Sequence, residues 1–120
     1  MVSTGRPESL SAVTIGVTDM DASCAFYDAL GFEVVHGGPG TAFTSYAVGS
    51  GFLNLQLVER AQPGWGRFIV HVDDVDAVHD RALASGLRPS MPPSDAPWGE
   101  RYFHIDDPDG HEVSFARPLG

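Results

Sequence analysis

The stretch that decides the fold occurs twice in the sequence, as VTDMDA at residues 17–22 and as VDDVDA at residues 72–77. Asp19 and Asp74 hold the same place in the two copies. Each can cap a helix, because a carboxylate accepts hydrogen bonds from the free N–H groups of the first turn. Gly31 and Gly86 follow at the same offset and suit the left-handed residue that ends a helix. The repeat therefore predicts two copies of one strand–helix–strand unit.

Alternation of apolar and polar residues predicts further strands before and after each helix. The apolar sets are Val13/Ile15/Val17, Leu53/Leu55/Leu57, Phe68/Val70/Val72, Phe103/Ile105 and Val113/Phe115. The DPDG stretch at residues 107–110 is a strong turn signal, because proline presets one dihedral angle and glycine accepts a positive φ. Strands and helices arranged in this way predict an α+β fold.

The chain length of 120 residues fits one domain. We expect a first half from about residue 8 to about residue 60 and a second half from about residue 66 to about residue 118. The linker between them contains Pro63 and glycines. Each half has too little core to stand alone, so no separately folding boundary is expected there.

Composition excludes several classes of protein. No apolar run approaches the roughly 20 residues that a membrane helix needs, and Met1–Pro7 lacks the pattern of a signal peptide. The one cysteine, Cys24, cannot form a disulfide within the chain, which indicates a reducing cytoplasm. The formal charge of −9 argues against nucleic-acid binding. The same charge fits either attraction of a cationic partner or simple solubility.

Together these segments resemble the vicinal oxygen chelate superfamily, which includes glyoxalase I, extradiol dioxygenases, fosfomycin-modifying enzymes and the bleomycin resistance proteins. The resemblance rests on residues 13–32, 70–87 and 97–115 and covers most of the chain. It implies two βαβββ modules that form a cupped mixed β-sheet, with helices on the outer face and the ligand site on the concave face. It also implies a homodimer, because chains with one pair of modules usually complete their cups with a partner chain.

Strand alternation assigns a second, mostly polar set of side chains to the concave face, as a ligand pocket requires. That set is Ala12, Thr14, Asn54, Gln56, Arg67, Ile69, His71, Tyr102, His104, Glu112 and Ser114. Trp98, in the loop before one of these strands, either stacks on a planar ligand or covers the core. The candidate ligand-binding residues are Thr14, Asn54, Gln56, Arg67, His71, Trp98, Tyr102, His104, Glu112 and Ser114.

The resemblance also implies metal ligands at positions where this sequence carries other residues. Metal-dependent members have histidine where this chain has Ala12 and Arg67, and glutamate where it has Ser114. The equivalent position in the first half is Asn54. Alanine and arginine cannot bind a divalent cation, and neutral serine or asparagine replace a carboxylate poorly. We therefore expect no cofactor and no metal at the family position.

A displaced metal site is the alternative, because His71, His104 and Glu112 also fall on the concave face and would suit Fe(II), Zn or Mn. Otherwise these side chains bond to one another or rim a polar pocket. His79 is expected on the outward side of its helix, and His111, next to a turn, is expected in solvent.

Two functions follow from these alternatives. The first is a metal-free protein that binds a small aromatic or cationic compound, for example to sequester an antibiotic. The second is a glyoxalase-like or dioxygenase-like enzyme that uses the displaced metal set, or takes His71 or His104 as a general base. Arg67 either pairs with Glu112 or binds an anionic ligand. No nucleic-acid or membrane partner is expected.

Overall fold

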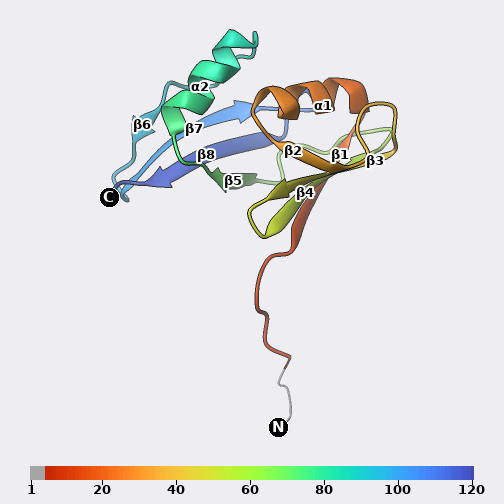
Figure 1. The fold of residues 1–120 in the computed structure, drawn as a ribbon, viewed down its shortest axis with the longest axis horizontal. Helices are drawn as coiled ribbons and strands as arrows, with labels where there is room; N and C mark the ends of the chain where they lie inside the picture. The colour runs from red at the N-terminus through yellow and green to blue at the C-terminus, as the bar shows by residue number, and fades with distance from the viewer. Residues whose placement is uncertain (1–4) are drawn as a thin grey trace.

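Strands and helices follow one another in the same order twice along the chain. The computed structural model describes residues 5–120, which Figure 1 shows with their labels. The first module contains β1 (Ala12–Val17), α1 (Met20–Ala29), β2 (Glu33–His36), β3 (Phe43–Val48) and β4 (Gly51–Leu57). The second module contains β5 (Arg67–His71), α2 (Val75–Ala84), β6 (Ser94–Asp95), β7 (Glu100–Asp106) and β8 (Glu112–Pro118). The expected α+β class with two βαβββ modules is confirmed.

The two helices begin and end as the repeat predicts. The carboxylates of Asp19 and Asp74 each accept a hydrogen bond of 3.0 Å from the backbone N–H group three residues further on. Gly31 and Gly86 follow the helices with φ angles of 89° and 81°, a conformation that costs glycine little. The matching caps explain why the two helices have the same length.

Each module forms a four-stranded mixed sheet, in the orders β1-β4-β3-β2 and β5-β8-β7-β6. The first strand of each module pairs in parallel with the last strand, and the other neighbours are antiparallel. β1 and β5 are therefore edge strands of their own sheets. The last strand, β4 or β8, lies inside its sheet, between the first and third strands.

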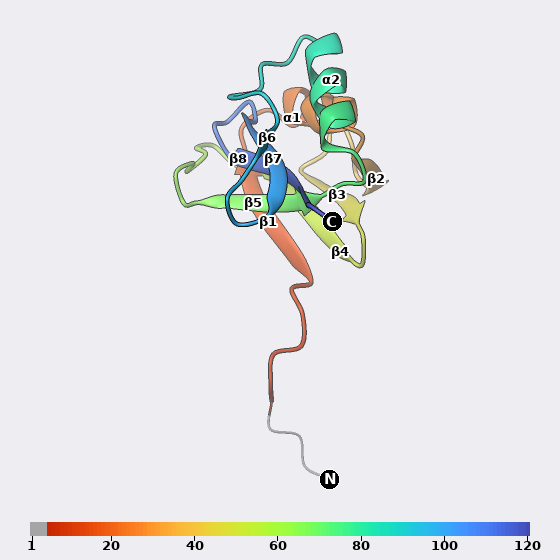
Figure 2. The same ribbon diagram turned by 90° about the vertical axis from the view of Figure 1, so that its left-hand side faces the viewer.

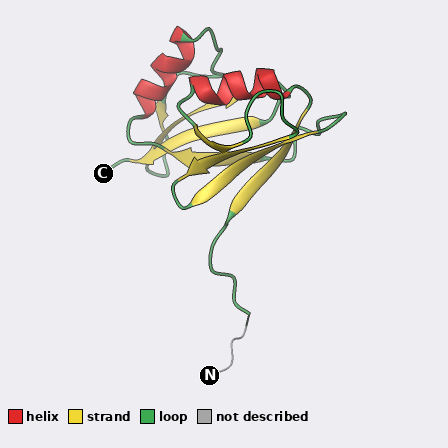
Figure 3. Ribbon diagram, turned by 45° about the vertical axis from the view of Figure 1, so that its right-hand side comes forward, coloured by secondary structure: helices red, strands yellow, loops and turns green. Residues whose placement is uncertain are grey.

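The apolar faces of the strands are buried beneath the two helices, which lie on the same side of the molecule (Figure 3). Val17, Leu55, Phe103 and Val113, from four of the predicted alternating sets, are almost wholly buried. Leu57 departs from its set, because 45% of its surface is exposed at the end of β4. The buried residues of both modules form one continuous cluster. The alternate residues of each strand consequently face the opposite, concave side.

The turn between β7 and β8 ties the second module to the first, and we call residues 107–111 the intermodule turn. Tyr27 of α1 donates a hydrogen bond of 2.8 Å to the buried carboxyl of Asp107. Thr18 donates to Asp109 through its backbone N–H at 3.1 Å and through its hydroxyl at 2.6 Å. The turn that the sequence predicts is therefore also a contact between the modules.

Residues 5–11 lead away from β1 and lie outside both sheets (Figures 1 and 2). Within residues 5–120, neither helix is long and apolar enough to cross a membrane. The expectation for Met1–Pro7 falls partly on residues 1–4, which lie outside the described part of the chain. The single domain and the module limits near residues 60 and 66 remain proposals.

Candidate functional site

Cross-strand hydrogen bonds in the first sheet show that its polar alternates share one face. Asn54 of β4 donates to the hydroxyl of Thr14 on β1 at 3.2 Å, and Ser45 of β3 donates to Asn54 at 2.7 Å. Gln56 is exposed further along β4. The polar groups of Thr14, Asn54 and Ser45 are thus largely satisfied by one another.

The second sheet holds a cavity of about 200 Å³ over β8, one of its two inner strands, and we call it the β8 cavity. The hollow exists because Ser114 and Ala116 are small, while the flanking strands carry longer side chains. Its lining residues are Arg67, Ile69, Trp98, Glu100, Tyr102, His104, Ser114 and Ala116. Half of the predicted ligand-binding residues therefore gather here: Arg67, Trp98, Tyr102, His104 and Ser114.

Three aromatic rings form one wall of the β8 cavity. The ring centroids of Trp98 and Tyr102 lie 5.7 Å apart with an interplanar angle of 32°, and those of Tyr102 and His104 lie 5.1 Å apart. The Trp98 indole N–H donates a hydrogen bond of 2.8 Å to Glu100, which holds a residue that is 69% exposed. Such exposure is incompatible with a role in covering the core. The indole therefore stands exposed beside the cavity and is not packed in the core.

Arg67 pairs with Glu112, the partner expected from the sequence, and the two residues stand opposite each other on β5 and β8. Nε of Arg67 donates to the Glu112 carboxylate. Their side chains are 49% and 32% exposed, so this ion pair is not a buried one. Within residues 5–120, the terminal Nη1 and Nη2 groups of Arg67 have no hydrogen-bond partner.

The residues at the implied metal positions do not fit a metal ion. Ala12 has no donor atom, and Arg67 is a cation engaged with Glu112. Ser114 is nearly buried, and its hydroxyl lies 2.5 Å from Nδ1 of His104. Arg67 and Ser114 are each bonded to another side chain, and within residues 5–120 these positions supply no set of metal-ligand atoms.

The displaced metal set does not assemble within the described chain. In residues 5–120, no three His, Cys, Asp or Glu side chains form a group that could hold a metal ion. His104 lines the β8 cavity, whereas His71 and Glu112 are not among its lining residues. The interpretation of His71, His104 and Glu112 as one ligand set is therefore wrong for this arrangement of the chain.

The environments of two other histidines differ from those predicted from the sequence. His111, expected in solvent, is 2% exposed. Its Nδ1 accepts a hydrogen bond of 2.9 Å from Trp65, and its Nε2 lies 2.7 Å from the Gly16 carbonyl oxygen. His79, expected to point outward, packs edge-on against Phe103 at 5.2 Å. Both contacts join segments that are distant in sequence.

A larger hollow of about 440 Å³ borders the free edge of β1. Of the predicted ligand-binding residues, only Thr14 lines it. Trp65 and His111 also line it, but their ring nitrogens already bond to each other and to the backbone. The β8 cavity, which gathers five of the predicted ligand-binding residues and several aromatic rings, is therefore the candidate site.

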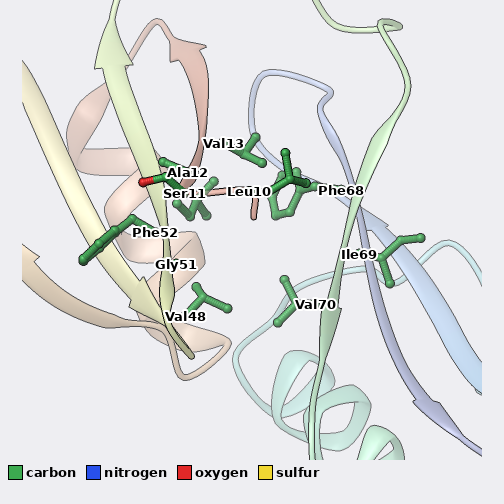
Figure 4. Close-up of a pocket in the computed structure, with 11 residues that line it drawn as sticks. Leu10, Ser11, Ala12, Val13, Val48, Gly51, Phe52, Phe68, Ile69 and Val70 are labelled. Carbon is green, nitrogen blue, oxygen red and sulfur yellow. The ribbon is translucent and has the colours of Figure 1, made fainter. Parts of the chain in front are cut away.

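A third hollow, of about 200 Å³, lies between the modules, and we call it the apolar seam. Figure 4 shows Phe68 and Val70 of β5 pointing toward Val13 and Val48 of the first module. Phe52, which is 43% exposed, also borders it. These side chains offer no hydrogen-bonding groups, so the seam is suited to contact with another apolar surface.

Three residues of the concave face were missed by the sequence analysis. Glu100 and Ala116 line the β8 cavity. Strand alternation predicts both, because Glu100 lies two residues before Tyr102 and Ala116 two residues after Ser114, and those two residues were assigned to the concave face. Ser45 lies on β3, for which no alternating apolar set was recognised. Nothing in the sequence therefore placed Ser45 on a strand face.

Comparison with known proteins agrees with this fold. The family model described as the Glyoxalase/Bleomycin resistance protein/Dioxygenase superfamily matches residues 9–115. A lactoylglutathione lyase from Agrobacterium tumefaciens is 25% identical with a TM-score of 0.75, over 92% of this chain and 94% of that chain. TioX from Micromonospora sp. ML1 is 26% identical with a TM-score of 0.74, over 93% and 100% of the two chains. A search of curated proteins finds no match.

One further solved structure is similar in fold alone. The bleomycin resistance determinant encoded on the transposon Tn5 is 19% identical to this chain, with a TM-score of 0.76 over 92% of this chain and 98% of that chain. The similar structures thus include both a named enzyme and a resistance determinant.

Proposed function

This chain belongs to the Glyoxalase/Bleomycin resistance protein/Dioxygenase superfamily, and from that premise we propose that it is a metal-free protein that binds a small aromatic compound in the β8 cavity. The observation that carries the proposal is the exposed Trp98, held beside a hollow whose floor is Ser114 and Ala116. A ring bound there would leave water for a site with aromatic rings beside it and small side chains beneath it. Sequestration of such a compound, an antibiotic among others, needs binding and no reaction.

The predicted binding residues outside the cavity keep a narrower role in this proposal. Thr14, Asn54 and Gln56 belong to the first sheet, whereas His71 of β5 and Glu112 of β8 lie beyond the lining residues. We propose that they contact only a ligand large enough to extend from the β8 cavity across the concave face.

Nuclear magnetic resonance of the ¹⁵N-labelled protein tests the binding proposal. The chain has two tryptophans, and they report on different places: Trp98 on the β8 cavity and Trp65 on the intermodule turn. Single-ring aromatic compounds added one at a time should move the indole N–H signal of Trp98 and leave that of Trp65 in place. If no such compound moves the Trp98 signal at millimolar concentration, the proposal is wrong.

Elemental analysis of the purified protein tests the metal-free part. We expect no stoichiometric metal, because Ala12, Arg67 and Ser114 supply no ligand pair. About one Fe, Mn, Ni or Zn per chain, lost in the His104→Ala variant, would contradict this part and favour an enzyme.

A second candidate function is an enzyme that uses His104 as a general base. The observation that favours it is the position of His104 in the cavity wall, with Nδ1 bonded to Ser114. Imidazole is an effective base near neutral pH, and the hydrogen bond would orient the ring. A compound that binds at Trp98 should then change chemically over hours with the wild-type protein and persist with His104→Gln. A compound that persists with both proteins supports binding alone.

We also propose a homodimer, located in the cytoplasm. The apolar seam exposes Phe52 and Ile69, which are 43% and 55% exposed, and a second copy of the chain would remove such surface from water. Cys24 is buried and unpaired, as a reducing compartment allows.

A further inference from the structure

We infer that the compound bound in the β8 cavity is a planar aromatic carboxylate, with its ring against the Trp98 wall and its carboxylate on Arg67. The inference rests on the proposed function, because it names the chemical class that the same cavity would bind. The observation behind it is that the ion pair with Glu112 uses only one edge of the Arg67 guanidinium.

A guanidinium presents N–H groups along two edges, and each edge can accommodate a carboxylate. Glu112 engages Arg67 through Nε. The edge formed by Nη1 and Nη2 has no partner within residues 5–120, although Arg67 lines the cavity. That edge carries two parallel N–H donors, which match the two oxygens of a carboxylate. Glu112 meanwhile holds the side chain in place, so less conformational entropy is lost when a ligand binds.

The two carboxylates near the cavity are each already engaged by another side chain, which makes them poor partners for a cationic ligand. Glu100 is the only acidic residue among those that line it, and one of its oxygens already accepts the Trp98 indole N–H. Glu112 is committed to Arg67 and does not line the cavity. A cation would therefore meet the free Nη edge of the guanidinium and a Glu100 carboxylate that already accepts a hydrogen bond.

The volume of the cavity limits the size of the ligand. An apolar cavity of about 150 Å³ is large enough to hold benzene. The β8 cavity, at about 200 Å³, therefore has room for one ring with a small substituent. Ile69 at its rim supplies further apolar contact.

The formal charge of −9 works against long-range attraction of an anion. The repulsion between this net charge and an anion is screened beyond about 8 Å at physiological salt. Contact between an anion and a guanidinium inside a cavity is screened much less. The contact between Arg67 and the ligand carboxylate, at hydrogen-bond distance, therefore decides that the cavity prefers an anionic ligand.

Three matched probes test the inference: benzoate, the neutral benzamide and the cationic benzylamine. Each is titrated into the ¹⁵N-labelled full chain while the Trp98 and Trp65 indole signals are followed. We expect benzoate to bind about tenfold more tightly than benzamide, because only benzoate makes a charged bidentate contact, and benzylamine to bind most weakly. Arg67→Met should remove the preference for benzoate, and Arg67→Lys should retain part of it. Arg88→Met, at an exposed arginine outside the cavity, should leave it unchanged.

The outcomes separate this inference from the proposed function. If benzamide or benzylamine moves the Trp98 signal at least as effectively as benzoate, the carboxylate inference is overturned while the aromatic site stands. The inference is also overturned if Arg67→Met retains its dispersed spectrum and binds benzoate as the wild type does. If none of the three probes moves the Trp98 signal, the proposed function fails, and the inference fails with it.

Discussion

Arg67 and Glu112 face each other across neighbouring strands, and both keep a substantial part of their side chains in contact with water. An exposed ion pair contributes little to stability, because water and salt screen it. We therefore expect Arg67→Ala to lower the free energy of unfolding by less than about 1 kcal/mol. Urea denaturation measures this, with Arg88→Ala as a control at an exposed arginine that has no ion-pair partner within residues 5–120. A loss of about 3 kcal/mol would show that the pair is buried in solution.

Asp107 is the residue whose titration should affect stability most plainly. Burial raises the pKa of this carboxyl, although hydrogen bonds from Tyr27 and from the His111 and Asp109 backbone oppose the shift. A carboxyl with a raised pKa in the folded state contributes stability that is present below its unfolded pKa of about 3.9 and lost as pH rises through the folded pKa. The wild type should therefore lose stability relative to Asp107→Asn over that pH range.

Urea denaturation of wild-type and Asp107→Asn proteins at several pH values from about 3 to about 7 checks this sign. The asparagine is neutral throughout. Its single oxygen can replace only one carboxylate oxygen, either Oδ2, which accepts from Tyr27, or Oδ1, which accepts from the Asp109 and His111 backbone, so the variant also carries a loss of stability that does not depend on pH. The quantity to follow is the free energy of unfolding of the wild type minus that of the variant. It should fall as pH rises, and a constant or rising difference would show that the hydrogen bonds outweigh burial.

The two helices share the same N-cap but differ in how deeply they are packed. α1 buries Met20, Ser23, Cys24, Phe26 and Tyr27, whereas α2 buries only Val75 and Ala82. Local opening of a helix is easier where fewer buried contacts must break. We therefore expect the amide hydrogens of α2 to exchange faster than those of α1.

Removing each cap in turn makes a matched pair of experiments. Asp19→Ala and Asp74→Ala each delete one capping hydrogen bond, at a cost of about 1 kcal/mol. In Asp74→Ala the loss should appear as faster amide exchange confined to α2. In Asp19→Ala it should appear in the global unfolding free energy, because α1 opens only with the core. Equal, global effects in both variants would contradict this difference between the helices.

At the scale of the whole molecule, the proposed homodimer predicts a mass of about 26 kDa by light scattering at micromolar concentration, twice the 12.8 kDa of the chain. If the apolar seam is the covered surface, Phe52→Ser should weaken the dimer, because Phe52 borders the seam. Leu83→Ser, at an exposed apolar residue of α2, is the matched control and should leave the dimer as stable as in the wild type. A wild-type mass near 13 kDa would contradict the dimer, and equal effects of both variants would contradict the seam as its interface.

Particular residues show how far the sequence predicted the candidate site. The concave-face assignments of Arg67, Glu112, His104 and Ser114 followed from alternation alone, and cross-strand bonds join them as pairs. Alternation states which side of a sheet a residue faces, but not where along the sheet a hollow forms. His71 was therefore selected with the same reasoning as His104, yet it lies outside the cavity lining.

The sequence by itself determined the local elements: both helix caps, both terminating glycines, the buried face of most strands and the turn at residues 107–110. These depend on residues close together in the chain, where capping and two-residue periodicity act. Only the tertiary structure decided the burial of His111, the link between Tyr27 and Asp107, and the hollow over Ser114 and Ala116. Each of these requires segments far apart in sequence to meet, and their meeting is set by the packing of the two modules.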